Sequence, residues 1–153
     1  MTSQVDYHDA HDAYIDAVAE ALRAAGFRTV LWWGDANDPR DGWIEVSPIG
    51  AYRSQTQVGL GWQEERGWHV LTVKEDAGWN KRGGHSEDAR CVYPLAVATV
   101  ASPETVVTTF AEMAGVKAEV PGDAYPDLDF PEHSFEDEDP AFEAALAAYR
   151  SGS

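Results

Sequence analysis

The sequence predicts an α+β fold in which one antiparallel sheet of four or five strands carries two helices on one face. Three observations predict it. Apolar residues recur with helical spacing near both ends of residues 9–115, short segments of alternating apolar residues lie between them, and turn residues separate those segments. The expected order is α-β-β-β-β-β-α, followed by an acidic linker and a short C-terminal helix.

Residues 9–25 are predicted to form the first helix. Acidic residues lie toward its N-terminal end and Arg23 toward its C-terminal end, which suits the helix dipole. Gly26 is the expected residue just beyond the last turn. Apolar side chains repeat at intervals of three and four, which makes one face of the helix apolar; they are Tyr14, Val18, Leu22 and Ala25.

Two strands are predicted next, over residues 28–33 and 43–46, with a loop of turn-forming residues from Gly34 to Gly42 between them. Consecutive strand residues point to opposite faces of a sheet. Trp32 and Trp33 therefore cannot both point into one core.

The clearest strand signal is a β-hairpin from Val58 to Glu75. Apolar residues alternate along both arms, which is the period expected of strands with one buried face. The polar loop between the arms ends in Gly67, a residue type that accepts the positive φ often needed there. We expect Trp62 and Trp68 to face each other across the two strands.

The remaining elements of the domain are a long loop, a strand and a helix. The loop covers Asp76 to Arg90, and a fifth strand is predicted over residues 92–100. Pro94 indicates an edge position for that strand, because proline has no N–H for the ladder. Ser102, followed by Pro103, predicts the start of the second helix, which should end at Gly115.

The composition changes from Pro121 to Pro140. This segment contains eight acidic residues and no Lys or Arg, so it carries half of the net charge. Such a segment is typical of a linker or an acidic tail, although its spaced aromatic residues are also typical of segments that dock on a partner or on their own domain. A short helix over residues 141–150 must dock somewhere to be stable. We therefore divide the chain into residues 1–120, 121–140 and 141–153.

The net charge of −16 and the pI of about 4.4 disfavour direct binding to nucleic acid or to an anionic membrane. No apolar run is long enough to span a bilayer. The N-terminal residues are polar and acidic, unlike a signal peptide, so we expect a cytoplasmic protein. Cys91 lies in an apolar run, which predicts a buried and inert thiol.

The motifs occur in a suggestive order. The first helix has the spacing Tyr14-x-x-x-Val18-x-x-x-Leu22-x-x-x-Gly26, residues 38–44 read DPRDGWI, residues 61–68 read GWQEERGW, and Pro103 opens the closing helix. This pattern resembles a small actinobacterial or actinophage domain of unknown function with a W-x-E-x-x-G-W hairpin between two helices. The resemblance covers roughly residues 10–116. It implies a fold and a lineage but no activity and no site.

Two groups of side chains contain residue types that can bind metal ions. The first is the loop set Asp35, Asn37, Asp38 and Asp41, which fails the EF-hand pattern because Arg40 stands where that loop requires Gly. The second is His8, His11 and Asp12, which share a helix face but have no second cluster to complete a site. An exposed, polar helix start explains the second group more simply. We expect no metal and no cofactor.

No catalytic constellation is evident in the sequence. Pairing of Cys91 with His69 or His85 has no supporting spacing. The loop Lys81–His85 has glycines beside basic residues, but it lacks the order of a P-loop. We therefore expect no catalytic residues and a protein that is not an enzyme.

The six tryptophans are the most unusual feature of the chain. One alternative is that the C-terminal helix or the tail covers the second face of the sheet. The other is that an exposed aromatic surface on that face binds a partner or a second copy of the chain. The candidate binding residues are Trp32, Trp33, Trp43, Trp62, Trp68, Trp79, Lys81 and Arg82.

These observations favour a non-enzymatic protein-binding, adaptor or chaperone-like module that acts through an aromatic sheet face, an acidic tail or both. The partner would be another protein or a second copy. One alternative is an acidic mimic of nucleic acid that inhibits a DNA-binding protein of a phage or mobile element. Another is a small-molecule-binding domain or an enzyme with an unrecognised site.

Overall fold

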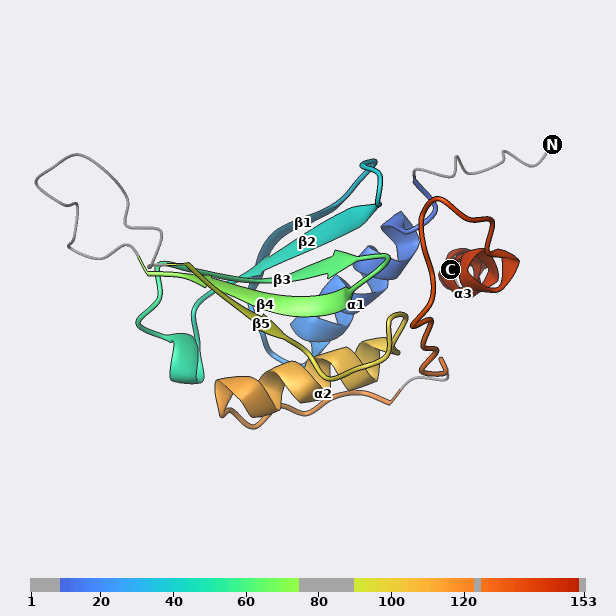
Figure 1. The fold of residues 1–153 in the computed structure, drawn as a ribbon. Helices are drawn as coiled ribbons and strands as arrows, with labels where there is room; N and C mark the ends of the chain where they lie inside the picture. The colour runs from blue at the N-terminus through green and yellow to red at the C-terminus, as the bar shows by residue number, and fades with distance from the viewer. Residues whose placement is uncertain (1–8, 75–89, 123–124, 152–153) are drawn as a thin grey trace, which may run out of the picture.

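The computed structural model describes residues 9–74, 90–122 and 125–151. It has one helix, five strands and two further helices, which confirms the α+β class (Figure 1). A short 3-10 helix, η2 (Gly50–Tyr52), lies between the second and third strands. The other elements are α1 (Asp12–Ala24), β1 (Thr29–Asp35), β2 (Asp41–Val46), β3 (Gln57–Gln63), β4 (Gly67–Val73), β5 (Arg90–Pro94), α2 (Pro103–Ala114) and α3 (Pro140–Ser151).

The five strands form one antiparallel sheet in the order β1-β2-β3-β4-β5. The predicted hairpin is confirmed, because Trp62 pairs with Trp68 and Gly67 has a φ of 77°. The fifth strand was predicted to continue to residue 100, which is wrong. The chain leaves the sheet after Pro94 and turns inward, so that Leu95 and Val100 are buried in the core.

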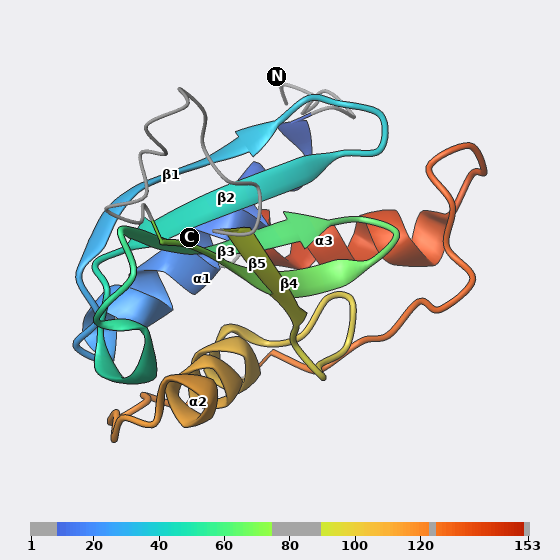
Figure 2. The ribbon, with the colours of Figure 1, turned by 60° about the vertical axis from the view of Figure 1, so that its left-hand side comes forward.

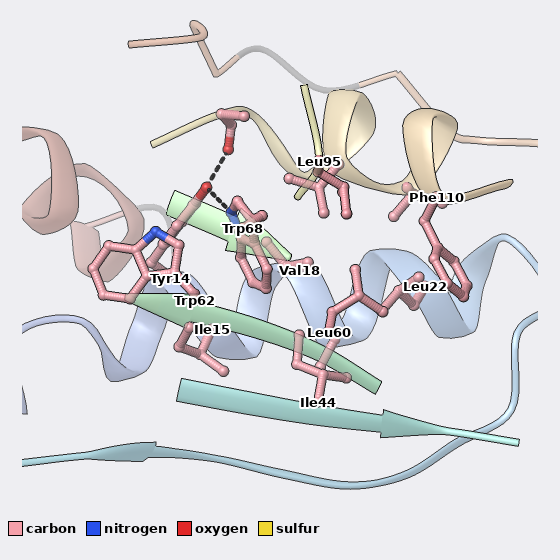
Figure 3. Close-up of a cluster of buried hydrophobic side chains, with 14 of the residues drawn as sticks. Tyr14, Ile15, Val18, Leu22, Ile44, Leu60, Trp62, Trp68, Leu95 and Phe110 are labelled. Atoms are coloured by element: carbon pink, nitrogen blue, oxygen red, sulfur yellow. Dashed lines mark hydrogen bonds between the residues drawn. The ribbon is translucent and has the colours of Figure 1, made fainter. Parts of the chain in front are cut away.

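All three helices lie on one side of the sheet (Figure 2). Helix α1 places Tyr14, Ile15, Val18 and Leu22 against the inner side chains of β2, β3 and β4 (Figure 3). The Tyr14 hydroxyl donates to the carbonyl of Ala101 and accepts from the Trp68 indole at 2.9 Å. The N-terminal end of α2 is capped as predicted, since the Ser102 hydroxyl accepts from the Thr105 amide.

Helix α3 belongs to the same hydrophobic core. Phe142 and Leu146 are fully buried, and the Phe142 ring stacks on Trp62. The core therefore contains side chains from both the helix–sheet region and the C-terminal helix. None of the described helices has the length and apolar character needed to cross a membrane.

The described part of the acidic segment packs against its own domain, which was one of the alternatives left open by the sequence. Leu128 forms an isolated antiparallel bridge with Val100. The carboxylates on either side of it bind backbone amides, because Asp127 accepts from Ser102 and Asp129 accepts from Thr99. These acids therefore satisfy polar groups at the start of α2 and just before it.

A buried ion network fastens the C-terminal part of the chain to the sheet. Arg40 is fully buried and donates from Nε and Nη2 to Glu64, at 2.8 and 3.0 Å, and from Nη1 and Nη2 to Glu143, at 3.0 and 2.6 Å. The ring nitrogens of His133 lie 2.8 Å from carboxylate oxygens of Glu64 and Asp139. Burial alone would raise the pKa of Glu64, but hydrogen bonds from Arg40 and His133 lower it to about 2.

If α3 is part of the core, Leu146→Ala should lower the free energy of unfolding by about 2–5 kcal/mol, because it leaves a cavity where the side chain is fully buried. Leu128→Ala is the matched control, since that leucine is 37% exposed and should lose much less. Urea unfolding of both variants measures the difference. Equal losses would contradict a shared core.

Glu64→Gln should destabilise the protein by about 3–5 kcal/mol at neutral pH, because the buried Arg40 loses the charge of its fully buried carboxylate partner. The pKa of Glu64 is depressed on folding, so its contribution is present above the unfolded value of 4.5 and is lost as the pH falls toward 2. As the pH falls from 4.5 toward 2, the free energy of unfolding should therefore decrease less steeply in Glu64→Gln than in the wild type. Urea unfolding at several pH values measures both profiles. Parallel profiles would show that Glu64 is not the group responsible.

Candidate functional site

The face of the sheet opposite the helices carries a row of cross-strand neighbours. The register aligns Trp33 of β1 with Trp43 of β2, then Gly61 of β3 and His69 of β4. Within the described residues, no helix lies over this face (Figure 2). The prediction that Trp32 and Trp33 point to opposite faces is confirmed, since Trp33 lies in this row and Trp32 packs against the core.

A hollow of about 640 Å³ lies over this row. On this side of the sheet β3 contributes two glycines, and ring side chains from the neighbouring strands occupy the space above them. A Cβ atom at Gly59 would collide with the Trp43 indole, and one at Gly61 would collide with the His69 ring. The glycines therefore let both rings lie flat on the backbone of β3. The alternation of Gly59 and Gly61 with large apolar residues predicts a strand, but it does not indicate which side chains cover the glycines.

One end of the hollow is acidic. Asp35 and Asp41 are directly paired across β1 and β2, and both line the hollow. The Trp33 indole donates to Asp35 Oδ2 at 2.8 Å, and Asn37 donates to Asp41 Oδ1 at 3.3 Å. Within the part of the chain that the structure describes, no Lys or Arg forms an ion pair with either carboxyl group.

The carboxyl group of Asp35 opposes the ionisation of Asp41. Burial raises the pKa of Asp41, and the charge and hydrogen bond of neighbouring Asp35 raise it further. The hollow also contains Arg66 and His69. Burial lowers the pKa of His69 and so favours the uncharged form of its ring.

The start of α1 supports the acidic end from beneath. His11 is fully buried and its Nε2 lies 2.7 Å from the backbone oxygen of Asp41, while its ring stacks on Trp62. Our expectation of an exposed helix start was therefore wrong, because the sheet and the helix close over His11. Burial also raises the pKa of Asp12. Among the described residues, no group of three or more His, Cys, Asp or Glu side chains has the geometry of a metal site.

The structure describes five of the eight predicted binding residues and separates these five into three groups. Trp33 and Trp43 line the hollow. Trp32 is half-buried on the core side, where its indole donates to Asp16 at 2.9 Å. Two tryptophans are buried in the core and so form no surface, namely Trp62 and Trp68. The other three candidates lie outside the described residues: Trp79, Lys81 and Arg82.

Cys91 is exposed, which corrects the prediction of a buried thiol. The apolar residues around it suggested burial, but β5 is an edge strand and all five of its residues are exposed. Its neighbour Val92 lines the hollow at the far side of the sheet.

Asp41→Asn should stabilise the protein at neutral pH. The raised pKa of Asp41 means that its ionisation costs stability as the pH rises above the unfolded value of 3.8, and the amide removes that cost. We expect the melting temperature to rise on the order of a few degrees at pH 7 and the gain to disappear below the unfolded pKa. Differential scanning calorimetry at pH 7 and at a pH below 3.8 measures the two melting temperatures. Glu112→Gln, at an exposed position on α2, is the control, and an equal gain there would contradict the explanation.

The matching family model extends from α1 to α2. It describes a family of unknown function (DUF6292) and matches residues 14–112, nearly the span of the resemblance inferred from the sequence. The match includes Trp33, Trp43, Asp35 and Asp41, and it ends before the acidic segment and α3. No curated protein matches the chain, and no solved structure matches it. Because the match covers most of its length, the chain belongs to this family of unknown function, DUF6292.

Proposed function

We propose that this protein is a non-enzymatic protein-binding module that uses the open face of its sheet. The observation that carries the proposal is the exposed aromatic surface over the hollow, where Trp33 is 44% exposed beside Trp43. Large aromatic side chains in a concave surface are the usual centre of a protein interface, because a partner can cover them completely.

The apolar character of this face extends beyond the two tryptophans. Leu31 lies two residues before Trp33 on β1. The register places Val92 of β5 in the same cross-strand row as Leu31. Both are largely exposed, at 42% and 55%. Exposed apolar side chains therefore lie on both edge strands of this face, which provides a suitable area for a bound polypeptide.

The acidic segment is a weaker candidate for the binding element. Asp127 and Asp129 bind backbone amides of their own domain, and Asp139 faces His133 and accepts from the Phe142 amide. A mimic of nucleic acid would need free carboxylates in rows. Engagement of these acids within the chain supports the sheet face as the binding surface instead.

Affinity capture with the full chain from the native host tests this proposal. We expect a specific protein to be retained, and Trp33→Ala or Trp43→Ala to reduce its recovery about tenfold or more. Leu128→Ala is the matched control, because it removes an exposed apolar side chain that does not line the hollow. The proposal fails if no protein is retained or if the tryptophan variants retain the same protein as well as the control does.

A further inference from the structure

The hollow combines two features that recognise positive charge. Its walls include the indoles of Trp33 and Trp43, and its end holds the carboxyl groups of Asp35 and Asp41. The hydrogen bond from the Trp33 indole to Asp35 fixes one ring beside one carboxylate. Indole faces attract a cation, and carboxylates bind it by charge and by hydrogen bonds.

We propose that this hollow receives the arginine or lysine side chain of an extended basic segment in a partner protein. The inference rests on the proposed function and specifies the chemistry of the partner. The aliphatic part of the side chain would lie along the indoles, and its cationic group would reach Asp35 and Asp41. Such a ligand supplies a cationic partner to two carboxyl groups that form no ion pair with a Lys or Arg among the described residues.

The charge of the molecule supports this occupant over others. The net charge of −16 repels a second copy of the chain, an anionic lipid surface and a nucleic acid alike. Within the described lining, Arg66 is the side chain with a fixed positive charge that opposes a bound cation, whereas two carboxyl groups in the same lining attract it. Burial lowers the pKa of His69, which favours the uncharged form of this ring.

The unfavourable proximity of Asp35 and Asp41 is also consistent with a binding role. The nearby Asp35 carboxylate raises the pKa of Asp41, which weakens the folded protein, and a bound cation would relieve the repulsion between the two groups. Their cost to the free protein thus becomes a gain in the complex. The fold itself does not use them as it uses Glu64 and Glu143, which hold Arg40 in the core.

A titration of the full chain with model compounds tests the inference. The probe is N-acetyl-arginine methylamide, and the matched control is N-acetyl-citrulline methylamide, which has nearly the same shape without the charge. The NMR signals of the Trp33 and Trp43 indole N–H groups, assigned from the Trp→Phe variants, report binding. We expect saturable shifts with arginine, affinity at least about tenfold lower with citrulline, and weaker arginine binding as salt is added.

The double variant Asp35→Asn/Asp41→Asn should reduce arginine affinity by about tenfold or more. It should remain folded, because each amide oxygen can still accept the hydrogen bond that the carboxylate accepted. Leu128→Ala should bind arginine as the wild type does. Equal binding of citrulline and arginine, or unchanged arginine affinity in the double variant, would overturn the inference.

The two proposals can fail separately. If a captured protein depends on Trp33 but not on Asp35 and Asp41, the sheet face binds a partner whose recognition is not cationic, and only this inference fails. If sedimentation shows a dimer that Trp33→Ala abolishes, the occupant is a second copy and this inference is again overturned. If the tryptophan variants retain the partner in full, the proposed function fails first.

Discussion

The buried guanidinium of Arg40 is the interaction on which the rest of the structure depends. It precedes β2, and its two carboxylate partners come from the turn between β3 and β4 and from the first turn of α3. Burying a charge is costly unless every donor has an acceptor of opposite charge. Once Arg40 lies inside the protein, the hairpin and the C-terminal helix must therefore hold fixed positions around it. The segment before α3 that carries His133 is held by the same Glu64 carboxylate.

Local patterns predict the elements of this fold well, since their causes are local. The hairpin follows from alternation and from Gly67, and α2 follows from Ser102 and Gly115. The docking of α3 has a different kind of cause. Arg40 and Glu143 are 103 positions apart, and nothing in the spacing of either residue indicates the other. The sequence of residues 121–140 is typical of a linker or tail for the same reason, since the partners that order it are distant in the chain. Asp127 and Asp129 accept hydrogen bonds from the backbone amides of Ser102 and Thr99.

The candidate site shows the same division. Strand alternation requires either Trp32 or Trp33 to point away from the core, but only the structure shows that it is Trp33. The pairing of Asp35 with Asp41 follows from the register of β1 and β2, which the sequence did not specify. The burial of Trp62 and Trp68, and the exposure of Cys91, depend on which strands have neighbours on each side. Aromatic composition alone could not distinguish a core tryptophan from a surface one.

The separation of Arg40 and Glu143 by 103 positions in the sequence has a consequence for folding during synthesis. During synthesis the sheet strands leave the ribosome well before residue 143 does, and until then the guanidinium lacks one of its two carboxylates. The nascent domain must keep Arg40 in contact with water, and Phe142 and Leu146 are not yet present to cover the core. The interior therefore cannot close fully around Arg40 until α3 has been synthesised, although most contacts between strands are local. A chain arrested before α3 would expose that side of its core to chaperones and proteases.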